Sequence, residues 1–189
     1  MRWNLPLVLT VARVAVIPAV LAMFYLPWEY ARQYATVLYA AAGFTDAFDG
    51  WLARRWHQES RFGAFLDPVA DKLLVTICLV MLLRDDDGTL GKLLPIVVAI
   101  IIGREITISA LREWMAELGA RTSVAVSWVG KFKTIFQMVA IGMMIWQRPT
   151  WGLPIYELGY FLLLIAAILT IWSMVMYLRA AWPLMREVR

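Results

Sequence analysis

Six long apolar segments constrain the fold of this 189-residue chain more than any other feature. They cover residues 5–26, 34–55, 61–84, 93–118, 122–146 and 153–177. A helix needs about 20 apolar residues to cross the hydrocarbon core of a bilayer, and each of the six segments is long enough. We therefore predict an all-α integral membrane protein, a bundle of about six transmembrane helices.

The composition supports this prediction. Hydrophobic residues make up 62% of the chain and charged residues only 17%, whereas a soluble domain is about a quarter charged. Six spans leave no length for a separate soluble domain, so we predict a single domain over residues 1–189. The one cysteine, Cys78, lies in an apolar run and is expected to be a buried apolar residue.

Charges between the segments predict an orientation. One side of the bundle carries Arg54, Arg55, Arg61, Arg112, Arg121, Arg179, Arg186 and Arg189. The other side carries Arg32, Arg84, Lys92 and Arg148, diluted by Glu29 and the run Asp85, Asp86 and Asp87. Excess Lys and Arg mark the cytoplasmic side of a membrane protein, so both termini and the 54–61 turn are expected to face the cytoplasm.

Aromatic residues gather at the ends of the segments. They are Trp3, Trp28, Tyr30, Trp56, Trp146, Trp151 and Tyr177. Trp and Tyr are enriched at membrane–water interfaces, so we interpret these residues as interfacial anchors.

Four aspartates stand at fixed spacing inside this apolar sequence: Asp46, Asp49, Asp67 and Asp71. An aspartate at the centre of a bilayer costs roughly 2.5–3.5 kcal/mol, so four of them require compensation. On helices, residues three or four apart share a face, which places each pair within one turn. Converging carboxylates repel one another unless a cation lies among them. Separate pairing with Arg54, Arg55 or Arg61 is the alternative.

The chemistry of the candidate ligands favours a hard divalent cation. An all-carboxylate site suits Mg²⁺ or Mn²⁺, whereas zinc usually recruits His or Cys. The only histidine, His57, lies in the basic turn and is expected to be a solvated loop residue. A cation transporter with an acidic ion path is a rival interpretation of the same four aspartates.

The aspartates belong to a longer pattern, D-x2-D-G-x2-A-R-x8-G-x3-D-x3-D, with eight fixed positions. At every fixed position the chain resembles the signature of the CDP-alcohol phosphatidyltransferase family. Three further stretches resemble the members that use glycerol 3-phosphate as acceptor. These stretches are Asn4-Leu5-Pro6 with Thr10 and Arg13, Gly103-Arg104-Glu105 with Leu111-Arg112-Glu113, and Gly130-Lys131-Phe132-Lys133-Thr134.

The resemblance implies roles for the signature residues. All four aspartates would hold a pair of divalent metal ions, and Asp71 would also be the general base that takes a proton from the acceptor alcohol. The donor nucleotide would bind against Gly50, Ala53, Arg54 and Gly63. Small residues leave room for a nucleotide against a helix, although close helix packing is the other explanation for them. Arg54 could contact a donor phosphate or hold an aspartate.

A dianionic acceptor requires fixed positive charge. The resemblance favours Arg112, Lys131 and Lys133 as acceptor-binding residues, although any of them could instead extend to the lipid headgroups. Arg104 could pair with Glu105 or Glu113, and Arg13 could line the same cavity or meet a headgroup.

The expected activity is therefore transfer of a phosphatidyl group from CDP-diacylglycerol to glycerol 3-phosphate. The resemblance also implies a homodimer in the bacterial inner membrane, in contact with membrane lipids and with its active site on the cytoplasmic side. Nothing in the chain predicts a nucleic acid partner. Inositol phosphate, serine or phosphatidylglycerol as the acceptor alcohol is the alternative within the family.

Overall fold

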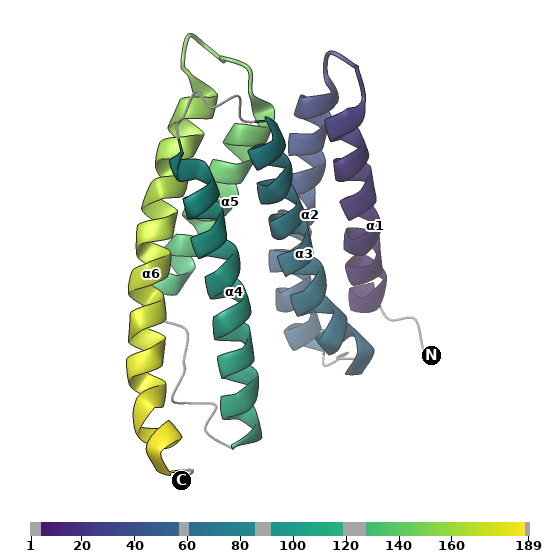
Figure 1. Cartoon of the computed structure of the whole chain (residues 1–189). Helices are drawn as coiled ribbons and strands as arrows, with labels where there is room; N and C mark the ends of the chain where they lie inside the picture. The colour runs from purple at the N-terminus through teal and green to yellow at the C-terminus, as the bar shows by residue number, and fades with distance from the viewer. Residues whose placement is uncertain (1–4, 57–60, 86–91, 119–127, 188–189) are drawn as a thin grey trace. The chain divides into compact units, whose positions relative to one another are not determined.

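The computed structural model describes residues 5–56, 61–85, 92–118 and 128–187. Within these ranges the chain forms six helices and no strand, which confirms the all-α prediction for this part of the chain. The helices are α1 (Leu5–Tyr25), α2 (Ala31–Trp56), α3 (Arg61–Asp85), α4 (Leu93–Glu117), α5 (Trp128–Trp146) and α6 (Ile155–Glu187) (Figure 1). Side chains are described for residues 11–45, 66, 69–85, 92–118 and 132–183.

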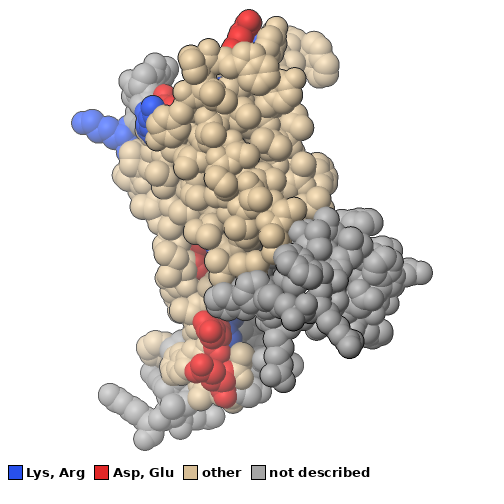
Figure 2. All heavy atoms as spheres, turned by 90° about the vertical axis from the view of Figure 1, so that its right-hand side faces the viewer, with Lys and Arg blue, Asp and Glu red and all other residues tan. Residues whose placement is uncertain are grey.

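Within the described residues, two helices are long and apolar enough to cross a membrane by themselves, Leu93–Glu117 and Ile155–Pro183. Two shorter apolar helical stretches, Val11–Tyr25 and Phe132–Trp146, accompany them. On the face drawn in Figure 2, most of the described surface is uncharged. These features fit a membrane-associated protein, and the count of six spans stays a prediction.

The helices group into two compact units, which we describe separately. Unit 1 comprises residues 1–86 and 141–159, and unit 2 comprises residues 87–140 and 160–189. Helices α1, α2 and α3 belong to unit 1, whereas α4 belongs to unit 2. Helices α5 and α6 contribute to both units. The single domain remains a prediction.

In unit 1, α1 packs against both α2 and α3, and consecutive helices run in opposite directions (Figure 1). Helix α2 buries small side chains, Ala31, Ala35 and Ala42, at a spacing of three or four residues along the buried face that also carries Tyr39. Small residues on one face let neighbouring helices approach closely. Helix α1 ends at Tyr25, close to Pro27, which lacks the N–H needed to continue a helix.

Ion pairs join the charged ends of elements in unit 1. Arg32, near the start of α2, pairs with Asp85, the last residue of α3. Arg148, which follows α5, donates to a carboxylate oxygen of Glu29 at 3.0 Å. The acidic run between the third and fourth predicted segments therefore begins with a residue that joins α3 to α2 through an ion pair.

In unit 2, α6 continues ten residues beyond its predicted end, from Tyr177 to Glu187. The predicted segment ended before the basic residues of the tail, whereas the helix continues through them. Tyr177 and Ala181, one turn apart, form a buried cluster with Ile108, Leu111 and Met115 of α4. This burial explains why α6 extends past the apolar segment.

Candidate functional site

The signature aspartates lie on two neighbouring helices of unit 1. Asp46 and Asp49 lie in α2, which ends at Trp56, and Asp67 and Asp71 lie in α3, which begins at Arg61. The prediction that both pairs stand on helices is confirmed. For Asp46, Asp49 and Asp67, and for the donor-side residues Gly50, Ala53, Arg54 and Gly63, only the helical backbone is described.

Asp71 is the one signature aspartate whose side chain is described, and it is exposed. Its neighbour Ala70 is fully buried, so this part of α3 presents one packed face and one open face. Tyr39 of α2 and Cys78 of α3 lie in the same region, because Tyr39 is within electrostatic range of both Asp71 and Cys78. Cys78 is buried, as predicted.

Helix α2 also contacts the part of α5 that belongs to unit 1. The hydroxyl of Thr36 lies 3.4 Å from the carbonyl oxygen of Gly142, and a Cβ at Gly142 would lie 3.9 Å from the side chains of Thr36 and Tyr39. The Tyr39 side chain is 2% exposed, and its hydroxyl has no hydrogen-bond partner within the described part of the chain. A buried phenol whose hydroxyl has no partner among the described residues was not anticipated from the sequence.

Arg13 of α1 is also in unit 1 and is 2% exposed. Its burial favours the interior position over the alternative in which it meets a lipid headgroup. A charged side chain within an apolar span was the sequence signal for this residue.

The predicted acceptor-binding residues lie in unit 2, where a second group of charges is described. Lys133 of α5 is 2% exposed and forms an ion pair with Glu105 of α4. Arg104, also buried, lies 3.4 Å from the same carboxylate oxygen and donates to the hydroxyl of Ser173 in α6 at 3.2 Å. One carboxylate therefore serves two buried cations, and the pairing of Arg104 with Glu105 that the sequence allowed is confirmed.

Arg112 lies at the more exposed end of this group. It donates to the hydroxyl of Tyr177 at 3.0 Å, and its guanidinium carbon is 5.1 Å from the centre of the Tyr177 ring. Tyr177 was predicted to be an interfacial anchor, but it is buried, with 5% of its surface exposed, because it packs against α4. The guanidinium carbon of Arg104 lies 5.8 Å from the centre of the same ring, so Tyr177 has both arginines beside it.

We call Arg104, Glu105, Arg112 and Lys133 the basic cluster. It combines three cations with one carboxylate and draws its members from α4 and α5, with hydrogen bonds to α6. Lys131, the third predicted acceptor ligand, lies in α5 with its side chain outside the described residues. Glu105 and Ser173 were not predicted as site residues, although a charged residue within an apolar span is itself a signal.

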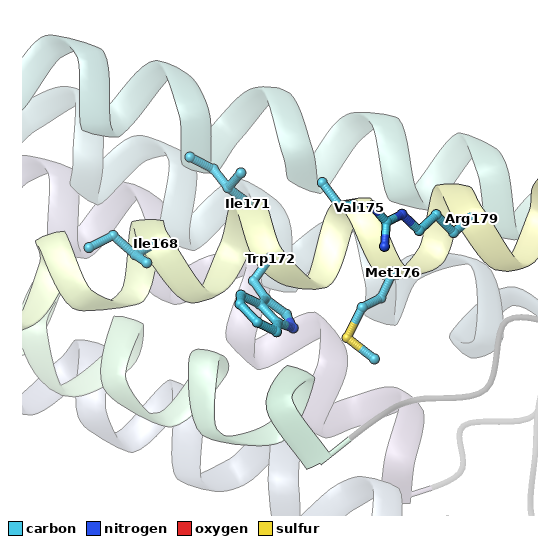
Figure 3. Close-up of a pocket in the computed structure, with 6 residues that line it drawn as sticks. All are labelled: Ile168, Ile171, Trp172, Val175, Met176 and Arg179. Carbon is cyan, nitrogen blue, oxygen red and sulfur yellow. The ribbon is translucent and has the colours of Figure 1, made fainter.

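An apolar groove of about 710 Å³ follows three turns of α6. Figure 3 shows the side chains that line it: Ile168, Ile171, Trp172, Val175, Met176 and Arg179. Arg179 is the only charged residue among them. The groove offers no carboxylate for a metal ion, so its chemistry differs from that of the signature residues.

Comparison with known proteins identifies the class. The model of the CDP-alcohol phosphatidyltransferase family matches residues 3–172. The chain belongs to this family of transferases, as the signature predicted. Its relatives include proteins of Salmonella choleraesuis (strain SC-B67), Shigella flexneri serotype 5b (strain 8401) and Escherichia coli (strain K12), all named CDP-diacylglycerol--glycerol-3-phosphate 3-phosphatidyltransferase. Each is 51% identical to this chain over 181 residues, which cover 96% of either protein.

Proposed function

We propose that this protein transfers the phosphatidyl group of CDP-diacylglycerol to glycerol 3-phosphate and releases CMP, a step of phospholipid biosynthesis. The observation that carries the proposal is the match of all eight signature positions in a chain that aligns over 96% of its length with relatives named for this reaction. The basic cluster of unit 2 supports a phosphorylated acceptor over a neutral one such as serine.

The four aspartates are the proposed ligands of a divalent metal pair, Mg²⁺ or Mn²⁺. The register of the described residues supports their convergence. Asp46 follows Tyr39 by seven residues, two turns along α2, and Asp71 precedes Cys78 by seven residues along α3. Because Tyr39 of α2 interacts electrostatically with Asp71 and Cys78 of α3, the helix faces that carry Asp46 and Asp71 are expected to adjoin.

Metal ions at this site would neutralise charge on the donor pyrophosphate and on the departing nucleotide. All-oxygen donors fit these ions better than they fit zinc or copper.

Asp71 is the proposed general base. The acceptor hydroxyl must lose a proton as it attacks phosphorus, and an exposed carboxylate can receive it. The new bond forms between the glycerol oxygen and the β-phosphorus of the donor, while the bond to the bridging oxygen breaks and CMP leaves. Direct attack inverts the configuration at phosphorus.

The basic cluster is the proposed binding site for the acceptor phosphate. Its excess of positive charge suits a dianion, and Arg presents a planar fork to phosphate oxygens. Arg112, the exposed member, is accessible to an incoming anion, and Lys133 lies deeper. Lys131 and the donor-side residues Gly50, Ala53, Arg54 and Gly63 complete the proposed substrate contacts.

We further propose a homodimer in the bacterial inner membrane, with both termini and the active site on the cytoplasmic side. An active site at the membrane surface suits the donor, because the acyl chains of the donor remain in the lipid while its cytidine is polar. The excess of Lys and Arg on that side supports the orientation.

The full chain, purified into vesicles with CDP-diacylglycerol, tests the proposal. CMP release should require both glycerol 3-phosphate and Mg²⁺ or Mn²⁺, and should stop when a chelator is added. Release with serine, inositol phosphate or phosphatidylglycerol, but not with glycerol 3-phosphate, would assign another acceptor. Metal flux across the vesicle without binding of a cytidine nucleotide would instead favour a transporter.

A further inference from the structure

Two buried neutral side chains of unit 2 have polar atoms without partners. Gln137 of α5 is 5% exposed and Thr170 of α6 is fully buried. Within the described part of the chain, neither the Oε1 atom of Gln137 nor the hydroxyl of Thr170 has a hydrogen-bond partner. A buried polar atom that lacks a partner costs about 1–3 kcal/mol, so two together in a helical core require an explanation.

Thr170 also departs from the behaviour of other threonines in this protein. A helical threonine commonly donates its hydroxyl to the carbonyl one turn earlier. Thr36 does so to Arg32 at 3.0 Å, and Thr107 does so to Gly103 at 2.8 Å. Because Thr170 makes no such bond, its hydroxyl is available to a group that does not belong to its own helix.

The register of the helices places Gln137 and Thr170 next to the basic cluster. Gln137 lies four residues after Lys133 in α5, and Thr170 lies three residues before Ser173, the residue that accepts from Arg104. Helices α5 and α6 run in opposite directions (Figure 1). Gln137 is therefore displaced from Lys133 by about 6 Å, and Thr170 from Ser173 by about 4.5 Å, in the same direction along unit 2.

We propose that Gln137 and Thr170 bind a hydroxyl group of the acceptor while the basic cluster binds its phosphate. The inference rests on the proposed function and extends it by naming residues that determine acceptor specificity. The arrangement suits a short phosphorylated polyol, with a charged end for the cations and a hydroxylated end for the neutral pair.

The chemistry of the pair fits a hydroxyl. The amide oxygen of Gln137 accepts a hydrogen bond, and the hydroxyl of Thr170 can donate or accept one. A site built to hydrogen-bond a substrate hydroxyl discriminates strongly against an analogue without it, because its own buried polar groups then stay unpaired. The amide oxygen of Gln137 and the hydroxyl of Thr170, which have no partner among the described residues, are the groups that such a site presents.

The test compares glycerol 3-phosphate with 3-hydroxypropyl phosphate, which lacks the secondary hydroxyl. The variants are Thr170→Val and Gln137→Leu in the full chain. Each should raise the KM for glycerol 3-phosphate by about 3- to 10-fold, the equivalent of one neutral hydrogen bond, and should reduce the preference for glycerol 3-phosphate over the analogue by the same factor. Inhibition by inorganic phosphate, which has no alcohol hydroxyl for Gln137 and Thr170 to bind, should change by less than about 2-fold.

Thr107→Val is the matched control, because Thr107 is exposed and its hydroxyl bonds to its own helix. Thr170→Ser, which keeps the hydroxyl, should restore the preference. An unchanged preference in both Thr170→Val and Gln137→Leu would overturn the proposal. So would an equal loss of glycerol 3-phosphate, analogue and inorganic phosphate binding. Failure of the wild-type protein to use glycerol 3-phosphate would refute the proposed function itself, a result these variants cannot mimic.

Discussion

Replacement of Lys133 with methionine tests the acceptor site most directly. Methionine keeps an unbranched apolar chain in place of the lysine stem and removes the ammonium group. Lys133 is 2% exposed, so its charge is sheltered from water and its contact with an incoming phosphate is not weakened by solvent. Glu105 would keep Arg104 at 3.4 Å, so the substitution does not leave the carboxylate unpaired.

The structure sets the size of the expected effect. A hydrogen bond between charged groups contributes about 1.5–3 kcal/mol, which corresponds to a rise of roughly 10- to 150-fold in the KM for glycerol 3-phosphate. The free energy of unfolding should fall less than for a fully broken buried ion pair, by about 1–3 kcal/mol, because Glu105 is partly exposed and retains a partner. The KM for CDP-diacylglycerol should be nearly unchanged.

The assay is CMP release at saturating Mg²⁺, with each substrate varied in turn. Lys92→Met is the control, since Lys92 is an exposed lysine immediately before α4 and outside the basic cluster. The reasoning is refuted if Lys133→Met changes the two KM values equally. It is also refuted if the variant remains folded and the KM for glycerol 3-phosphate does not rise.

Three further predictions concern unit 1. Asp71→Asn should lower turnover by at least about 100-fold while a cytidine nucleotide still binds, measured by calorimetry, and retained turnover would exclude Asp71 as the base. Tyr39→Phe removes a buried hydroxyl that has no partner in the described ranges, so the free energy of unfolding should stay the same or rise by up to about 1 kcal/mol, relative to the exposed control Tyr34→Phe. A clear loss would show that the hydroxyl has a partner. Gly142→Leu should destabilise by about 1–3 kcal/mol in denaturant unfolding, whereas Gly142→Ala should be tolerated, because its Cβ would make ordinary contacts at 3.9 Å.

The sequence predicted the helices well because long apolar segments have few alternatives. The predicted ends of the first four segments lie within three residues of those of α1 to α4. The end of α6 was missed because the apolar run stops at Tyr177, whereas packing of Tyr177 and Ala181 on α4 continues the helix. Near the end of α6 the sequence is less apolar on average, but residues one turn apart are still buried.

The site was predictable where its chemistry is rare in such a sequence. Aspartates within apolar segments, and Lys133 within another, stand out because each is costly in lipid. Gln137 and Thr170 did not stand out, because neutral polar residues occur often in helical spans. Their significance depends on which hydrogen bonds they lack, and that depends on the packing of three helices.

The carboxylate of Glu105 competes with any incoming anion for the cations of the basic cluster. An anion with one negative charge gains little by replacing a carboxylate that already pairs with Arg104 and Lys133. A doubly charged phosphate can outcompete it. Since the second ionisation of a phosphate monoester has a pKa of about 6, acidification converts the favoured ligand into the disfavoured one. Acceptor capture should therefore weaken below about pH 6 even if every residue of the protein keeps its charge.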